Sequence, residues 1–160
     1  PVPVTLVNAA GVNINDYLLA LRQVPEPVLA AFNAAGWTYR IDFDYMGGLS
    51  KKLNMSCIGA TNYSQKTIYL SEASATLHEF GHFLDWMLGF PAEYEQLFRA
   101  EASAAPLRNY AKTDSREYFA DCFAYWVKYA ENANAISLLQ ECAPMTYRYM
   151  EDLMRIANRL

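Results

Sequence analysis

The sequence predicts an α+β fold, in which a small N-terminal sheet and one histidine-bearing helix precede a mostly helical C-terminal lobe. Two patterns predict this fold. A stretch before position 71 alternates aromatic and β-branched residues, as strands do. From Ser71 onward the pattern is almost wholly helical. The size agrees, because 160 residues that are 53% hydrophobic and 19% charged suit one globular domain with its own core. We therefore expect residues 1–160 to form a single domain.

Two helices are predicted near the N-terminus. Asn15–Val24 has a helical pattern, which Pro25 and Pro27 interrupt. The pattern resumes over Glu26–Gly36, with Pro27 near the first turn and the final glycine as its stop.

Two strands are predicted next. Trp37–Tyr45 alternates aromatic and β-branched residues and is predicted to be a strand. Met46–Ser56 carries two glycines and two lysines, which favours a loop. Thr67–Leu70 is the second predicted strand, after a turn at residues 62–65.

The remaining elements are predicted to be helices. Ser71 is the expected N-cap of a helix that Gly89 and Pro91 end. Four further helices are expected over Ala92–Ala102, Ser115–Ala130, Ala133–Gln140 and Thr146–Asn158.

Composition excludes two classes of partner. The net charge is −4 and the lysines and arginines are scattered, whereas a protein that binds phosphate backbones normally has a basic surplus. No nucleic acid is therefore expected as a partner. No apolar run approaches the roughly 20 residues that span a bilayer, so no membrane span is expected. The three cysteines form no C-x-x-C pair and are expected to be buried thiols.

The chain's only two histidines, His78 and His82, stand in the sequence H-E-F-G-H. Residues four apart in a helix share one face, so both imidazoles can point at one metal ion. Zn²⁺ accepts imidazole nitrogen and prefers tetrahedral geometry. Glu79 lies on the adjacent face, where it reaches a water on the metal without being a ligand, as in H-E-x-x-H metallopeptidases.

The alternative is a structural helix that carries the two histidines by chance. This helix is apolar nearly all round, which implies burial, and buried imidazoles and carboxylates need partners. A metal ion supplies such a partner, so we favour the metal site. The apolar residues are Phe80, Phe83, Leu84, Trp86 and Met87.

A third ligand must be a carboxylate or a thiolate, because no other histidine exists. One branch of the H-E-x-x-H metallopeptidases places its third ligand six residues after the second histidine. That position is Leu88 here, which excludes this branch. Asp85 follows His82 by only three residues, too close on the same helix to turn onto the same ion. Glu117 and Asp121 are four apart and share a helix face. We predict that Glu117 binds the metal and that Asp121 accepts the outer N–H of a ligating histidine.

Other interpretations of these carboxylates stay open. Glu117 also fits a capping box that begins at Asp114, and Asp121 fits a solvated helix side. The weaker candidates for the third ligand are Glu93, Glu95, Glu101 and Cys122.

The chain contains the run H-E-F-G-H-F-L-D and, later, E-Y-F-A-D at Glu117–Asp121, with Tyr110 seven residues before Glu117. This combination resembles the catalytic domain of anthrax lethal factor and the related Pro-Pro endopeptidases. The resemblance is strongest over Ile58–Trp126. These proteins are gluzincins, so it implies a zincin-type fold and a zinc-dependent endopeptidase that uses a metal-activated water. It implies one Zn²⁺ on His78, His82 and Glu117, with Glu79 as base and Tyr110 stabilising the oxyanion.

The resemblance also implies how substrate binds. In zincins an edge strand holds an extended peptide through main-chain hydrogen bonds. The strand ahead of the H-E-F-G-H helix fits that description. The predicted substrate-binding residues are therefore Lys66, Thr67, Ile68, Tyr69 and Leu70.

Two other functions compete with this one. The sequence F-A-D-C-F-A-Y-W faintly resembles the ImmA/IrrE-type regulatory metallopeptidases, which act on a repressor inside the cell. A non-catalytic zinc-binding or peptide-binding module is the other alternative, but it needs neither Glu79 nor Tyr110. We predict a secreted monomer acting on peptides or proteins, with a bacterial or phage-encoded cytoplasmic protein as the alternative.

Overall fold

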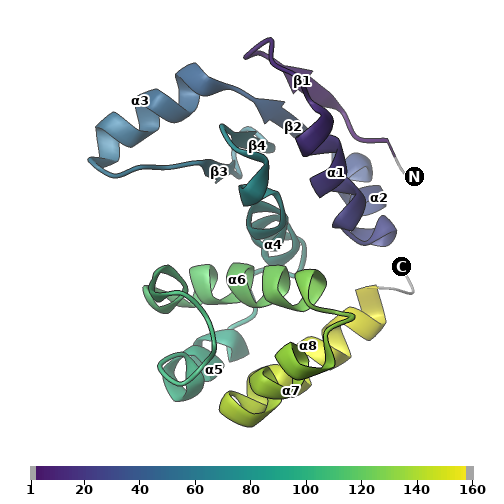
Figure 1. Cartoon of the computed structure of the whole chain (residues 1–160), viewed down its shortest axis with the longest axis vertical. Helices are drawn as coiled ribbons and strands as arrows, with labels where there is room; N and C mark the ends of the chain where they lie inside the picture. The colour runs from purple at the N-terminus through teal and green to yellow at the C-terminus, as the bar shows by residue number, and fades with distance from the viewer. Residues whose placement is uncertain (1–2, 158–160) are drawn as a thin grey trace. The chain divides into compact units, whose positions relative to one another are not determined.

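The computed structural model of the chain describes residues 3–157 and has an α+β fold, as predicted. Within these residues there are four strands, eight α-helices and two short 3₁₀ helices (Figure 1). The chain divides into two compact units, residues 1–80 and 81–160. Helix α4 (Thr76–Met87), which carries H-E-F-G-H, runs through the point of division. A single catalytic domain over the whole chain stays a prediction.

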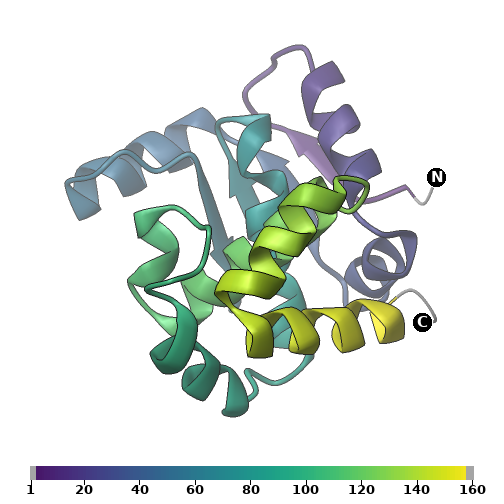
Figure 2. The ribbon, with the colours of Figure 1, turned by 60° about the horizontal axis from the view of Figure 1, so that its bottom comes forward.

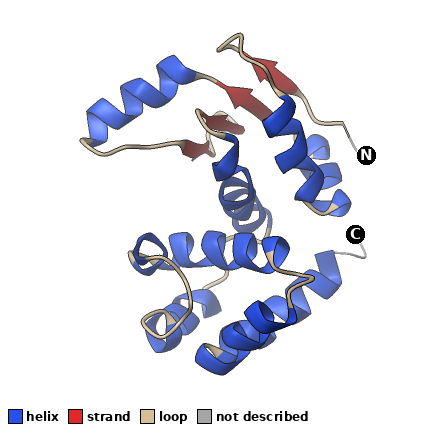
Figure 3. Ribbon diagram, viewed as in Figure 1, coloured by secondary structure: helices blue, strands red, loops and turns tan. Residues whose placement is uncertain are grey.

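The sheet lies in the first unit and has the strand order β1-β2-β4-β3 (Figure 3). Strands β1, β2 and β4 are parallel to one another, whereas β3 is antiparallel to β4. Strand β3 therefore ends the sheet on one side. The strands are β1 (Leu6–Asn8), β2 (Thr38–Ile41), β3 (Gly59–Asn62) and β4 (Thr67–Leu70).

The prediction that residues 66–70 form an edge strand is wrong. Strand β4 pairs with β2 on one side and with β3 on the other, and all four of its residues are buried. Lys66 precedes the strand and has a left-handed φ of 50°. The physical reason is visible in the strand itself: a short run of apolar and β-branched residues suits an interior strand with both faces covered. The neighbouring strands already occupy the main-chain groups of β4.

Helix α3 (Phe43–Leu53) replaces the end of the strand predicted over Trp37–Tyr45 and the loop predicted at residues 46–56. The strand stops at Ile41 because the Asp42 side chain caps the new helix, accepting a hydrogen bond from the Tyr45 N–H at 2.9 Å. The helix ends at Asn54, which has a left-handed φ of 52°. The caps at Asp42 and Asn54 therefore determine that this segment is a helix, despite the two glycines between them. Helix α3 projects from the end of β2 in Figure 1.

The other helices of the first unit are α1 (Asn15–Gln23) and α2 (Glu26–Ala34), both as predicted. Strands β1 and β3 were not predicted. They are only three and four residues long, and β3 holds a glycine, so their sequence signals are weak.

Ser71 is not the N-cap of α4. A 3₁₀ helix, η1 (Ala73–Ala75), comes first, and α4 begins at Thr76. The Ser71 N–H instead donates to the Ile58 carbonyl at 3.0 Å, which extends the pairing of β3 with β4. The Thr76 hydroxyl bonds that of Tyr39 at 2.8 Å, both buried, so the start of α4 is tied to the centre of the sheet.

The second unit is helical, as predicted. Helices α7 and α8 are in contact, and Figure 2 shows them diverging from the end at which they join. The Glu101 carboxylate caps α8 by accepting the N–H groups of Met145 at 3.0 Å and Thr146 at 2.7 Å. The predicted end of the last helix, Asn158, lies outside the described residues. The elements are α5 (Glu93–Glu101), η2 (Asn109–Lys112), α6 (Ser115–Lys128), α7 (Ala133–Cys142) and α8 (Pro144–Ala157).

An aromatic cluster forms the core of the second unit. The Tyr94 ring packs edge-on against Phe119 and Tyr149, with ring centroids 4.7 and 5.0 Å apart. Cys122 lies in this core, where burial raises the pKa of its thiol to about 12, so it stays protonated at neutral pH. None of the three cysteines is bonded to another, but the prediction of three buried thiols is correct only for Cys122, because Cys57 and Cys142 are partly exposed. No helix among residues 3–157 combines the length and apolarity that a membrane crossing requires.

Candidate metal and catalytic site

Three predicted ligands come together in the structure. His78 and His82 stand one turn apart on α4, and Glu117 is in the first turn of α6. Each of the three offers one ligand atom, and these atoms all lie within 4.8 Å of one another. The Glu117 Oε1 lies 2.6 Å from the His82 Nε2, and all three side chains are buried.

The donor set fits a metal ion. Two imidazoles and one carboxylate are the protein ligands of one class of catalytic zinc site. Ligand bonds of about 2.1 Å at tetrahedral angles place ligand atoms about 3.4 Å apart. One pair lies 2.6 Å apart, which is closer than that value, and no pair is more than 4.8 Å apart. Small side-chain movements therefore suffice to hold an ion.

The N-terminus of α6 explains how Glu117 is placed. The Asp114 side chain caps the helix and accepts the Glu117 N–H at 2.8 Å. The N-cap half of the predicted capping box is thus formed through the backbone of Glu117, while its carboxylate lies against His82. Glu101, one of the weaker candidates, uses its carboxylate to cap α8.

Gly81 lets α4 and α6 approach each other within the second unit. A Cβ at this position would lie 2.7 Å from the Ala120 Cα and 2.8 Å from its carbonyl oxygen. Real Cβ atoms essentially never come this close, and helix backbone cannot swing aside as a flexible side chain does. The glycine of H-E-F-G-H is therefore a packing residue, and this contact lies one turn from Glu117.

We expect Gly81→Ala to separate α4 from α6 and to weaken zinc binding. Overpacking of this kind costs about 1–3 kcal/mol of unfolding free energy. Thermal melting with and without zinc, together with the zinc content, measures both effects. Gly48→Ala in α3 is the matched control, because a Cβ there meets nothing within 4 Å. A Gly81→Ala protein with the parent's melting temperature and zinc content would contradict this account.

Glu79 lies beside the ligand group but is not part of it. Its Oε1 accepts a hydrogen bond from the Thr61 hydroxyl at 2.9 Å. Its Oε2 lies 3.9 Å from the His78 Nε2. The side chain is buried, and its carboxylate lies next to a nitrogen of His78, one of the predicted ligands. This position suits a general base, and the role of Glu79 as that base stays a prediction.

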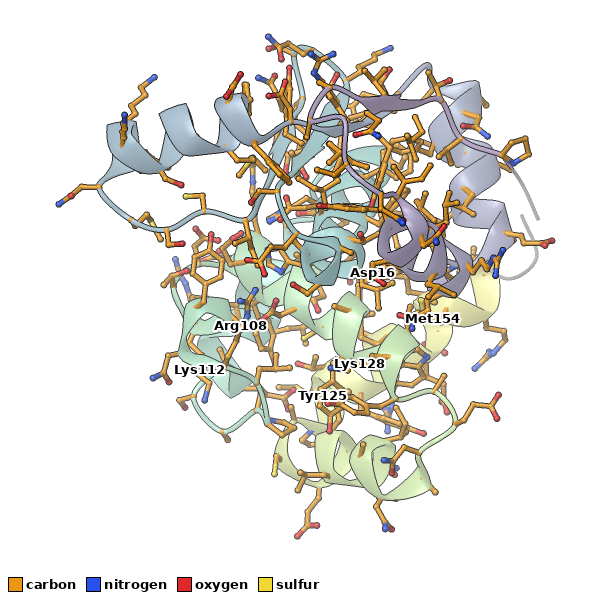
Figure 4. The ribbon with its side chains drawn as sticks, turned by 45° about the horizontal axis from the view of Figure 1, so that its top comes forward. Asp16, Arg108, Lys112, Tyr125, Lys128 and Met154 are labelled. Atoms are coloured by element: carbon orange, nitrogen blue, oxygen red, sulfur yellow. The ribbon has the colours of Figure 1, made fainter. Side chains whose placement is uncertain are left out.

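Tyr110 lies on η2, and 40% of its surface is exposed. The Arg108 guanidinium stands 5.0 Å from the centre of the Tyr110 ring. Arg108 also donates to both carboxylate oxygens of Asp121, at 2.8 and 3.0 Å. This hydrogen bonding raises the pKa of Arg108 above its ordinary value. Figure 4 shows Arg108 and Lys112 on the segment that leads into α6.

These contacts join the segment of Tyr110 to helix α6. The predicted bond from Asp121 to a ligating imidazole and the predicted oxyanion role of Tyr110 both stay predictions. Sequence reasoning missed Arg108, because a single arginine among thirteen basic residues gives no signal of its own. It also missed Thr61, which no motif marks.

Comparisons with known proteins agree on the family and the fold. The family described as "Anthrax toxin lethal factor, N- and C-terminal domain" matches residues 38–153. A Pro-Pro endopeptidase of Clostridioides difficile (strain 630) is 30% identical over 83 residues, which are 49% of this chain and 36% of that protein. The chain thus matches about a third of that relative's length. The solved structure of the Pro-Pro endopeptidase PPEP-2 from Paenibacillus alvei matches with a TM-score of 0.70. That match has 19% identity and covers 92% of this chain and 96% of the other, and it confirms the predicted fold.

Proposed function

Since this chain belongs to the anthrax toxin lethal factor family, we propose that it is a zinc-dependent endopeptidase that hydrolyses peptide bonds within extended peptides. The observation that carries the proposal is the buried group of His78, His82 and Glu117 with the Glu79 carboxylate beside it. Two imidazoles and one carboxylate would hold a zinc ion through three protein ligands, the number that catalytic zinc sites have. The names of the two relatives, both Pro-Pro endopeptidases, support the same class of reaction.

One Zn²⁺ would be held by His78, His82 and Glu117. When bound, it supplies a Lewis acid that activates water and polarises the scissile carbonyl. Glu79 takes a proton from the attacking water and passes it to the leaving amine. The Tyr110 hydroxyl donates a hydrogen bond to the oxygen on which negative charge develops. Asp121 holds a ligand imidazole by accepting its outer N–H.

We expect a peptide substrate to bind at one edge of the sheet. Strand β3 ends the sheet on the side next to β4, and within residues 3–157 no strand pairs with its outer side. An extended peptide would add to that edge by main-chain hydrogen bonds. Peptides with two consecutive prolines are the first substrates to test, because both relatives carry that specificity in their names. Secretion and a monomeric state remain predictions.

The test joins metal analysis to peptide cleavage. We expect the purified protein to hold about one zinc per chain, the number of ions that one three-ligand site binds. We expect it to cleave members of a mixed peptide library that includes Pro-Pro sequences. A chelator should stop cleavage, and added zinc should restore it. Stoichiometric zinc without cleavage of any library member would favour the non-catalytic module, and cleavage that is insensitive to chelation would exclude a metallopeptidase.

A further inference from the structure

Two of the four residues of β3 face the carboxylate of Glu79. Gly59 and Thr61 are two positions apart, so they share a face of the strand. The Thr61 hydroxyl donates to the Glu79 Oε1 at 2.9 Å. At Gly59 a Cβ would lie 2.9 Å from both the Cγ and the Oε2 of Glu79. One residue of β3 thus binds the carboxylate, and the other leaves the space in which it lies.

The two oxygens of Glu79 have different surroundings. Thr61 engages Oε1, whereas Oε2 lies 3.9 Å from the His78 Nε2. A carboxylate held through one oxygen keeps its other oxygen available for proton transfer. We propose that Thr61 is a positioning residue, whose hydroxyl holds Glu79 so that Oε2 is presented to the reacting water. This inference rests on the proposed function.

The same strand would also touch the substrate. The Ser71 N–H donates to the Ile58 carbonyl, so Ile58 belongs to a hydrogen-bonded pair of the antiparallel ladder. Hydrogen-bonded and non-hydrogen-bonded pairs alternate along an antiparallel ladder, so the next hydrogen-bonded residue of β3 is Ala60. The main-chain N–H and C=O groups of Gly59 and Thr61 therefore point to the outer side of β3, away from β4. A peptide added to that edge would bond to the backbone of the residues that hold Glu79. Thr61 would therefore set the distance between base and scissile bond.

The competing explanation is that Thr61 only satisfies a buried polar atom. A hydroxyl with that role alone affects stability, whereas a positioning hydroxyl affects turnover in particular. Thr61→Val and Thr61→Ser separate the two roles. Valine has the shape of threonine without the hydroxyl and suits a strand. Serine keeps the hydroxyl and loses only the methyl group. Thr61→Ala is the second hydroxyl-free variant if valine is not accommodated.

We expect Thr61→Val to lower kcat roughly tenfold, a fraction of the 10²–10⁴ that a positioned base contributes. KM should stay within about twofold, because the edge of β3 is intact, and the zinc content should not change. Thr61→Ser should restore kcat to near the parent value. In the Glu79→Gln background, Thr61→Val should have no further effect on kcat, because the hydroxyl acts through Glu79. Crystal structures of the Thr61→Val protein should show the Glu79 carboxylate moved from its place in the parent.

Parent-like kcat in the hydroxyl-free variants would overturn the inference. So would a serine variant as impaired as the valine variant, or an equal loss in the Glu79→Gln background. If the parent shows no metal-dependent cleavage, the proposed function fails by that result alone. The position of Glu79 in the crystal structures then decides whether Thr61 places it.

Discussion

Replacing Glu79 by glutamine is expected to abolish nearly all peptide hydrolysis and to leave zinc bound. Glutamine has the size and shape of glutamate, and its carbonyl oxygen can still accept the hydrogen bond that Thr61 donates to Oε1. The amide cannot take a proton at neutral pH, so only base catalysis is removed. Such a loss lowers kcat by roughly 10²–10⁴. The measurements are kcat on a cleaved peptide and the zinc content of the same preparation.

Glu72→Gln is the matched control, because it makes the same change at an exposed glutamate just ahead of η1. That variant should keep the parent's kcat. Full activity in a Glu79→Gln preparation free of parent protein would remove Glu79 from the role of base. Loss of zinc together with activity would instead assign Glu79 to the metal site itself.

Replacing Glu117 by alanine is expected to remove zinc and activity together. Only His78 and His82 would remain as protein ligands, and a catalytic zinc site normally has three. Loss of a residue that merely supports a ligand already costs about 10–100-fold in metal affinity, so loss of a ligand should cost at least about 100-fold. Competition with a chromophoric chelator measures the zinc affinity, and thermal melting shows whether the apoprotein is folded.

Glu95→Ala controls for the loss of a glutamate from a helix of the same unit. Glu95 pairs with Arg99 at the surface at 3.1 Å, and a surface pair of this kind contributes little to stability. Zinc affinity should not change in this control. A Glu117→Ala protein that binds zinc as tightly as the parent would exclude Glu117 as a ligand and would reopen the choice among the other carboxylates.

Several interactions within a few residues of sequence could be predicted. The two histidines share a face of α4 because a helix turn spans about four residues. The cap that Asp114 forms over Glu117 follows from a spacing of three residues. The segment around α3 was predicted wrongly even at this range, since glycines and lysines signalled a loop while Asp42 and Asn54 cap a helix. Residues that favour a loop and residues that cap a helix occur in the same segment, and the sequence alone does not show which of the two effects is stronger.

The sequence by itself determined the residue types that the proposed chemistry needs: two imidazoles four positions apart, a glutamate between them and a carboxylate on a later helix. Only the tertiary structure decided that Glu117 lies 2.6 Å from His82, because that contact depends on how closely α6 packs against α4 at Gly81. The tertiary structure also made β3 and not β4 the edge of the sheet, and it brought Thr61 to Glu79. Contacts within one helical turn follow from backbone geometry. Contacts between distant segments depend on which surfaces pack together, and no spacing in the chain encodes that choice.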